Sequence, residues 1–274
     1  MKLLLNAAAL RDVNGDPARS SRLMSGAKAE KSRLDVALAE RGLAPSRERA
    51  QALIMAGQVE VEGVRVEKAG TRIAKDARIE ISGQALKYAS RGGLKLEGAL
   101  EDFGVKVEGK ICVDAGSSTG GFTDCMLQKG ASKVYAVDVT ASQLDWKLQQ
   151  DKRVVMIERN ARYLRAGDIG DAVSLITADV SFISVTKILP ALLGVAAAGA
   201  DFVILIKPQF ELEKREIGKG GIVREEGLRE KAIQRVREAA GQLGLEVLGV
   251  KASRLPGAEG NQEFFLHARA ARLE

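Results

Sequence analysis

The sequence predicts two domains, a small α+β domain followed by a larger α/β domain built on a doubly wound, seven-stranded sheet. From Lys110 onward, short apolar runs alternate with helical stretches, which is typical of a mostly parallel sheet. Between Ser32 and Ser82, two short amphipathic helices precede a β-type alternation. A chain of 274 residues, 46% of them hydrophobic, is long enough to form one large core and a small second one.

Composition narrows the choice of partner and compartment. Lys and Arg number 42 against 36 Asp and Glu, and the net charge of +6 favours a polyanionic partner, although ordinary basic enzymes share it. No run reaches the roughly 18 to 20 apolar residues of a membrane helix, so we expect no membrane partner. Cys112 and Cys125 have no metal or redox spacing, and the only histidine, His267, lies in an apolar strand. We therefore expect no metal site and a cytoplasmic protein.

The first 31 residues show no sustained periodicity, and we expect a disordered extension there. The apolar start ends at Arg11, too early for a convincing signal peptide. Residues 1–23 are either an over-extended translation start before Met24 or an unstructured basic arm.

The elements of the first domain, residues 32–82, follow from local signals. Leu34 to Leu43 has helical spacing, Ser46 can cap a second helix, and Gly57 can close it. Residues 59–66 alternate about a glycine turn, and 64–68 and 73–81 read as further short strands. Residues 83–93 form a linker, after which a helix is expected over 94–103 with Lys95 in its first turn. A lysine is unfavourable there, so Lys95 is either a surface residue or meets an anion.

The second domain, residues 94–274, contains seven apolar strands, at 111–113, 133–137, 154–157, 174–178, 202–206, 246–250 and 264–267. The first of them ends in Asp114-Ala-Gly-Ser-Ser-Thr-Gly-Gly121, whose glycines let the backbone turn tightly and approach a ligand. The motif lacks the Gly-Lys-Ser/Thr of a phosphate-binding loop and departs from GxGxxG. Asp138 ends the second strand, close to the spacing of roughly 20 residues at which an acid reaches the ribose of an adenine nucleoside.

Polar residues stand where other strands begin or end. Asp179 follows the fourth strand, Lys207 follows the fifth, and Glu263 precedes the last. Together with Lys95, these two lysines and two acids beside a nucleotide-type pocket suit removal of a proton from a sugar hydroxyl. Alternatively, any one of the four residues forms a structural salt bridge, and Asp179 caps the following turn. Lys207 leaves an apolar strand, and its amine emerges there beside acidic residues that can orient it.

Residues 32–66 resemble an S4 domain, through Arg33-Leu-Asp, Arg41-Gly, Ser46-Arg47, Arg49-Ala50, Leu53-Ile54 and Gly57-Gln-Val59. S4 domains are RNA-binding modules. The resemblance implies that Arg41, Arg47 and Arg49 contact RNA phosphates. The alternative is a solvated charged helix face, because acidic residues dilute the charge.

Over most of residues 32–269, the chain resembles the hemolysin A-like (TlyA-type) ribosomal RNA methyltransferases, within the FtsJ-like ribose 2′-O-methyltransferases. Besides the glycine motif, the resemblance rests on Ser90-Arg91-Gly92-x-x-Lys95-Leu96, on Gly218-Lys-Gly-Gly-Ile-Val-Arg224, and on the ordered tetrad of Lys95, Asp179, Lys207 and Glu263. It implies a class I, Rossmann-like methyltransferase fold in which this tetrad is catalytic. Lys207 would take the hydroxyl proton or orient the hydroxyl, and Glu263 would position Lys95 or Lys207.

The resemblance also implies the cofactor and the partners. S-adenosyl-L-methionine would bind at Asp114, Gly116, Ser117, Gly120, Gly121, Phe122, Asp138, Asn160 and Asp179. Arg91, Lys214, Arg215, Lys219 and Arg224 would contact RNA. The substrate would be a cytidine ribose in ribosomal RNA, presented as RNA or as ribosomal subunits. Two alternatives stay open, a non-catalytic RNA-binding factor in ribosome assembly and, because of the family's name, a hemolysin.

Overall fold

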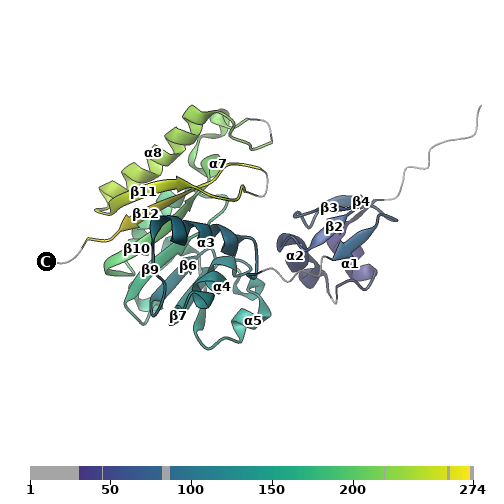
Figure 1. The fold of residues 1–274 in the computed structure, drawn as a ribbon, viewed down its shortest axis with the longest axis horizontal. Coiled ribbons are helices and arrows are strands. Elements are labelled where there is room, and N and C mark those ends of the chain that lie inside the picture. Colours follow the sequence, from purple (N-terminus) through teal and green to yellow (C-terminus); the bar gives the residue numbers. More distant parts are fainter. Residues whose placement is uncertain (1–30, 45, 82–86, 219, 258–259, 272–274) are drawn as a thin grey trace, which may run out of the picture.

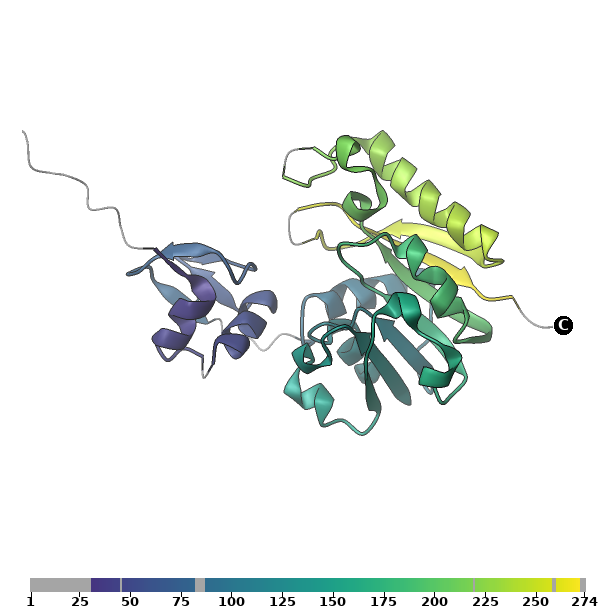
Figure 2. The same ribbon diagram turned by 180° about the vertical axis from the view of Figure 1, so that it is seen from behind.

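The computed structural model describes residues 31–44, 46–81, 87–218, 220–257 and 260–271. Residues 1–30 of the expected N-terminal extension, part of the expected linker and Lys219 therefore lie outside the described residues, whereas Lys31, expected in the extension, begins a strand. The described chain forms two lobes (Figures 1 and 2). The smaller lobe comprises residues 31–81, and the larger one contains the central sheet.

The small lobe has the two helices and short strands that the sequence predicts. Its core gathers Leu34, Leu38, Ile54 and Val59. Ser46 caps the second helix by accepting a hydrogen bond from the Arg49 amide at 3.2 Å. The elements are β1 (Lys31–Arg33), α1 (Leu34–Glu40), α2 (Arg47–Met55), β2 (Val59–Val61), β3 (Val64–Arg65), β4 (Arg72–Ala74) and β5 (Ile79–Ile81).

The segment 73–81 contains two strands that belong to different sheets. β4 pairs with β1, whereas β5 pairs with β2 in a sheet of order β3-β2-β5. The turn between β4 and β5, where the Ala77 amide bonds to the Ala74 carbonyl, redirects the chain from one sheet to the other. Sequence alternation does not reveal which neighbour a short strand will choose.

The large lobe is a seven-stranded sheet of order β11-β12-β10-β9-β6-β7-β8, in which β12 runs antiparallel to both of its neighbours. All seven predicted strands are present, which confirms the doubly wound α/β fold. Their bounds are β6 (Ile111–Ala115), β7 (Lys133–Asp138), β8 (Val154–Glu158), β9 (Val173–Ala178), β10 (Ala196–Ile206), β11 (Glu246–Ala252) and β12 (Phe264–Arg269).

Helices cover both faces of this sheet (Figures 1 and 2). Neighbouring strand residues enter opposite cores: Cys112 and Leu175 pack with α3 and α4, whereas Val113 and Ile176 pack with α6 and α8. The central strands are therefore buried on both faces, whereas the edge strands β8 and β11 are partly exposed. The helices are α3 (Gly92–Phe103), α4 (Gly121–Gln128), α5 (Trp146–Gln149), α6 (Leu189–Leu193), α7 (Pro208–Glu211) and α8 (Glu226–Gln242). Short 3₁₀ helices lie at 141–143, 161–163, 166–168, 185–187 and 214–216.

The strand order places a crevice between β6 and β9. From β6 the chain proceeds outward through β7 and β8, and it then returns to add β9 on the other side of β6. In open α/β sheets, ligands bind at the carboxyl ends of the strands where the order reverses in this way. The glycine motif follows β6 and Asp179 follows β9, so both stand at that point.

Candidate active site

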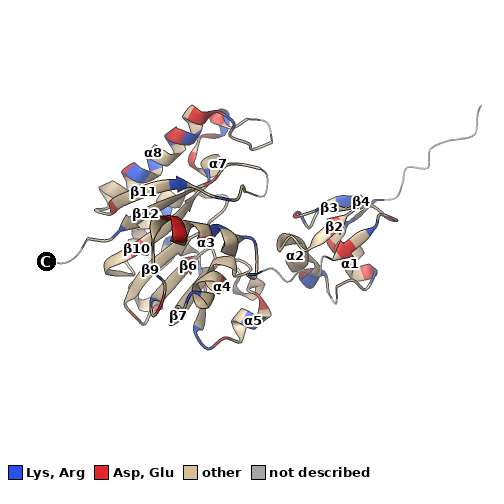
Figure 3. Ribbon diagram, viewed as in Figure 1, with Lys and Arg blue, Asp and Glu red and all other residues tan. Residues whose placement is uncertain are grey.

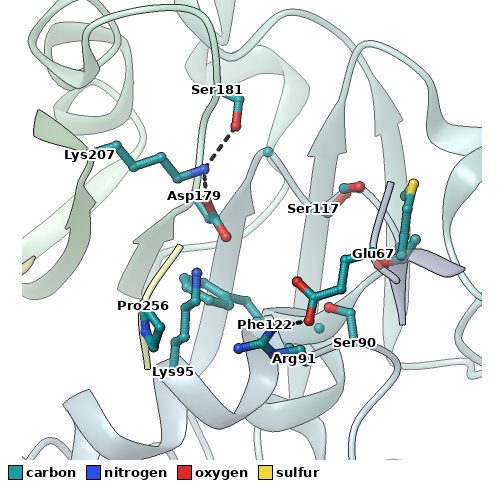
Figure 4. Close-up of a pocket in the computed structure, with 16 residues that line it drawn as sticks. Glu67, Ser90, Arg91, Lys95, Ser117, Phe122, Asp179, Ser181, Lys207 and Pro256 are labelled. Carbon is teal, nitrogen blue, oxygen red and sulfur yellow. Dashed lines mark hydrogen bonds and ion pairs between the residues drawn. The ribbon is translucent and has the colours of Figure 1, made fainter. Parts of the chain in front are cut away.

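A cavity of about 390 Å³ opens at this crevice (Figure 4). Three residues of the predicted tetrad line it, namely Lys95, Asp179 and Lys207. The glycine motif contributes one wall, and the small lobe reaches the rim through Met55 and Glu67. The other lining residues are Ser90, Arg91, Gly92, Gly116, Ser117, Ser118, Thr119, Gly121, Phe122, Ser181 and Pro256.

The glycines of the motif stand where no side chain fits. Gly116 has a φ of +83°, and a Cβ there would lie 2.5 Å from the Asp179 carbonyl oxygen. At Gly121, a Cβ would lie 2.2 Å from the Ser90 hydroxyl oxygen. These close approaches bring the ends of β6, β9 and α3 together and leave bare backbone facing the cavity.

Lys207 and Asp179 form one half of the tetrad. The Lys207 ammonium lies 2.6 Å from Asp179 Oδ1 and donates to the Ser181 hydroxyl at 2.8 Å. Asp179 Oδ1 is buried without a hydrogen bond, so its contact with Lys207 is an ion pair outside hydrogen-bond alignment. Ser184, rather than Asp179, caps the next short helix. The alternative reading of Asp179 as a cap therefore has no support in the geometry.

Lys95 and Glu263 form the other half. Their charged atoms lie 2.6 Å apart, with the Lys95 side chain 12% exposed and that of Glu263 3% exposed. Gly257 makes room for this carboxylate, because a Cβ there would lie 2.5 Å from Glu263 Oε1. Of the two partners that the sequence allows for Glu263, the structure places Lys95 beside it.

Asp114 lies beneath the glycine motif and not on the cavity wall. It is fully buried and accepts hydrogen bonds from the hydroxyls of Thr123 at 2.7 Å and Thr177 at 3.4 Å. Burial raises the pKa of Asp114 to about 7, against the hydrogen bond from Thr123, and the charge of Asp179 raises it further. Its expected contact with the cofactor stays a prediction.

Asp138 and Asn160 are likewise absent from the cavity wall, and both bond to nearby backbone. Asp138 accepts from the amides of Ser118 at 2.9 Å and Thr140 at 3.1 Å, and so holds the glycine motif in place. Asn160 is exposed and caps a 3₁₀ turn through the Arg162 amide at 3.0 Å. Each carboxylate oxygen has a second lone pair, so Asp138 can still accept a hydrogen bond from a sugar hydroxyl.

These features fit S-adenosylmethionine. Gly116 and Gly121 leave a cradle that a Cβ would fill, and Ser117 and Thr119 add small polar side chains. Asp138 supplies a half-buried, acceptor-only group at the end of β7. Of the residues predicted to bind the cofactor, Gly116, Ser117, Gly121, Phe122 and Asp179 line the cavity, whereas Gly120 lies behind the wall against Leu148 and Leu144. Cofactor binding by these residues stays a prediction.

The arginines of the small lobe that were expected to meet RNA are already engaged within the protein. Arg41 donates to the carbonyls of Lys75 and Ala77, at 2.5 Å and 2.6 Å. Arg47 binds the buried carboxylate of Asp35 at 2.9 Å. Arg49 lies 3.7 Å from Asp145 of the large lobe. An arginine has five donors, so these contacts leave room for phosphate, and RNA contact stays a prediction for all three.

Arg91 reaches from the start of α3 to Glu67 of the small lobe, so an ion pair joins the two lobes at the rim of the cavity (Figure 4). Three further residues that were predicted to contact RNA are exposed, namely Lys214, Arg215 and Arg224. Arg215 is paired with Glu213 at 2.7 Å. Basic and acidic residues both occur along α8 and in the small lobe (Figure 3).

Sequence reasoning missed three groups around the tetrad. Ser181 follows Asp179 by two residues, and its proximity to a charged strand end was a usable signal. Asn261, 1% exposed, binds the Val223 amide and the Gly221 carbonyl, and so ties the predicted RNA loop 218–224 to the segment that carries Glu263. Glu211 is a buried acid close to Lys207 in the chain, and the sequence around it does not predict that it is buried.

Other side chains of chemical interest are structural. Cys112 and Cys125 are buried, free thiols, and burial raises the pKa of each to about 12. His267 lies 3.0 Å from Asp201, far along β12 from the cavity. Among the described residues, no cluster of three or more His, Cys, Asp or Glu side chains could hold a metal ion. In the same part of the chain, no helix is long and apolar enough to cross a membrane.

Comparison with known proteins finds a known domain that matches each lobe. The FtsJ-like methyltransferase family matches residues 88–270, and the S4 domain matches residues 32–79. The 16S/23S rRNA (cytidine-2′-O)-methyltransferase TlyA of Mycobacterium tuberculosis is 46% identical, covering 88% of this chain and 91% of that protein. Hemolysin A of Brachyspira hyodysenteriae is 45% identical, covering 86% and 98%.

A solved structure from Streptococcus thermophilus, provisionally named a hemolysin, is 44% identical with a TM-score of 0.69, covering 89% of this chain and 90% of that one. These matches extend over both lobes, and they join the S4 domain to the methyltransferase sheet in one chain. The protein therefore belongs to the FtsJ-like methyltransferase family, among relatives named TlyA and hemolysin A.

Proposed function

We propose that this protein transfers a methyl group from S-adenosylmethionine to the 2′-hydroxyl of a cytidine ribose in ribosomal RNA. The observation that carries the proposal is the arrangement of two lysine-carboxylate pairs, Lys207 with Asp179 and Lys95 with Glu263, whose lysines both line one cavity beside the glycine motif. The TlyA relative, which bears that activity in its name, supports the choice of substrate.

The cofactor, when bound, supplies an electrophilic methyl group on a sulfonium. The residues of this chain must then align a ribose hydroxyl and receive its proton. Lys207 is held by Asp179 and Ser181 at the carboxyl end of β10, so its amine is fixed in place. Lys95, fixed by Glu263, presents a second cation that can hold the hydroxyl or an adjoining phosphate.

In this proposal, Asp138 and the backbone of the glycine motif bind the cofactor, and the S4 lobe places the RNA. The partner is ribosomal RNA, free or within a ribosomal subunit, which sets the site of action in the cytoplasm. Glu67 and Met55 reach the cavity rim, so RNA held by the small lobe would lie beside the tetrad.

Methylation of unmodified ribosomal subunits tests the proposal. The purified chain is incubated with S-adenosylmethionine and either subunit, and the RNA is digested and analysed by mass spectrometry for 2′-O-methylcytidine. We expect methylation by the native chain and none by Asp179→Asn. Cofactor and RNA binding without any methyl transfer would instead favour an assembly factor, and lysis of red cells by the pure protein would favour a hemolysin.

A further inference from the structure

We propose that Glu211 is a positioning residue of this site, whose buried carboxylate ties the segment that follows Asp179 to the segment that follows Lys207. The inference rests on the proposed function and adds to it a residue outside the tetrad. It concerns how the Lys207-Asp179 pair is held and involves no contact between Glu211 and a substrate.

The two segments need such a tie because their strands fix only the backbone. β9 and β10 run parallel, and their pairing ends with Ala178 opposite Ile204. Asp179 and Lys207 both lie beyond this ladder: the Asp179 amide still bonds to the Ala115 carbonyl of β6 before irregular chain begins, and Lys207 directly precedes α7. Their 2.6 Å contact therefore depends also on what anchors the chain after each strand.

Glu211 supplies the anchor. It lies at the end of α7 with only 2% of its surface exposed. Its carboxylate accepts from the Ser184 hydroxyl at 2.5 Å and from the Val185 amide at 2.8 Å, which are the cap and first residue of the 3₁₀ helix after Asp179. Its own carbonyl accepts from Arg235 of α8 at 2.8 Å, so the tie is fixed to a long helix.

The segment that Glu211 holds is under conformational strain. Phe182 has a φ of +66°, in the left-handed region that side chains disfavour, and it is 93% exposed. Such backbone persists only where the surroundings impose it. The centroid of the exposed Phe182 ring lies 5.5 Å from that of the Phe210 ring. The two hydrogen bonds to Glu211 lie two and three residues beyond Phe182, and in this proposal they help to impose its conformation.

Burial of a carboxylate is unfavourable, so an acid at this position requires a reason. Burial raises the pKa of Glu211, and the bonds from Ser184 and Val185 oppose that shift. An apolar side chain would fill the space but would leave the Val185 amide without an acceptor. A glutamine could replace both bonds, since its carbonyl accepts from Val185 and its amide can donate to Ser184.

The test compares Glu211→Ala, Glu211→Gln and Ser184→Ala in the full-length chain. The first readout is independent of activity: reductive methylation of lysines, followed by mass spectrometry. Lys207 and Lys95 are each 12% exposed, so Lys95 is an internal control. In Glu211→Ala, we expect the reagent to modify Lys207 at least about fivefold faster than in the native chain, because only the Lys207 pair loses its anchor. The rate of modification of Lys95 should be unchanged.

The second readout is single-turnover methylation of ribosomal subunits. Glu211→Ala should be slower by about 10- to 100-fold with cofactor and RNA affinities within about threefold, and Glu211→Gln should be close to the native rate. Added to Lys207→Ala, Glu211→Ala should cause little further loss, since it acts through Lys207. Val236→Ala, a buried position on α8, controls for lowered stability alone.

Ser184→Ala removes one of the two hydrogen bonds to Glu211 and replaces Glu211→Ala in the test if that variant does not fold. It should show faster modification of Lys207 and slower methylation, both to a smaller degree. If Lys207 is modified at the native rate in both Glu211→Ala and Ser184→Ala, the proposal is overturned. The proposal would also be overturned if the methylation rate fell as far in Glu211→Gln as in Glu211→Ala, because charge and not hydrogen bonding would then be required. A native chain that methylates nothing refutes the proposed function and leaves the lysine readout to decide on Glu211.

Discussion

Replacement of Lys207 by arginine separates two roles that the structure allows for this residue. The Lys207 ammonium lies 2.6 Å from Asp179 and 2.8 Å from Ser181, in a side chain that is 12% exposed. Arginine keeps the positive charge and can keep the pair with Asp179. It cannot give up a proton near neutral pH, and its planar fork does not match a single hydroxyl.

The expected loss follows from the role. If Lys207 accepts the hydroxyl proton, Lys207→Arg should lower single-turnover methylation by about 10² to 10⁴, the range for loss of a general base. This corresponds to roughly 2.7 to 5.5 kcal/mol in activation free energy. If Lys207 only supplies a fixed cation, the variant should stay within a few-fold of the native rate, because the ion pair survives.

The assay is single-turnover methylation of ribosomal RNA with cofactor and enzyme in excess, combined with calorimetry of cofactor binding. Lys133→Arg is the matched control, since Lys133 pairs with Asp171 at the same 2.6 Å but at the amino end of β7, away from the cavity. A native rate in Lys207→Arg would refute the assignment of Lys207 as the base.

Three further predictions follow. Asp138→Ala should weaken S-adenosylmethionine by roughly 1.5 to 3 kcal/mol, the usual range for a hydrogen bond to a charged group, with RNA affinity unchanged; calorimetry that shows native cofactor affinity would contradict it. Gly257→Ala should displace Glu263, because the new Cβ would lie 2.5 Å from Oε1, and methylation should fall about 10-fold or more while cofactor affinity persists. In the small lobe, the hydrogen bond from Arg33, with those from Gln51 and Arg47, outweighs burial and holds the pKa of Asp35 well below its usual range. Its stabilisation should therefore be complete above pH of about 4 and be lost as the pH falls through the depressed pKa; Asp35→Asn should cost roughly 2 to 4 kcal/mol at pH 7, and an unchanged pH dependence of thermal unfolding in this variant would count against the network.

Local signals in the sequence determined the elements of this protein and the order of its chemical groups. Apolar runs predicted all seven strands of the large sheet, and they are most continuous in the central strands, which are buried on both faces. Ser46 marked a helix start through a cap that needs only its own neighbours. Asp179 and Lys207 could be placed at one edge because the carboxyl ends of parallel strands meet there.

Only the tertiary structure decided which groups meet. Glu263 could have served either lysine, and the room left by Gly257 sets it beside Lys95. Glu67 of the small lobe meets Arg91, and Glu211 meets Ser184, through contacts between segments far apart in the chain. Such pairs depend on the paths of loops and on which way a side chain points, and neither is encoded in the periodicity of nearby residues. The sequence therefore determined the reacting groups, and the packing of the folded chain fixed their partners.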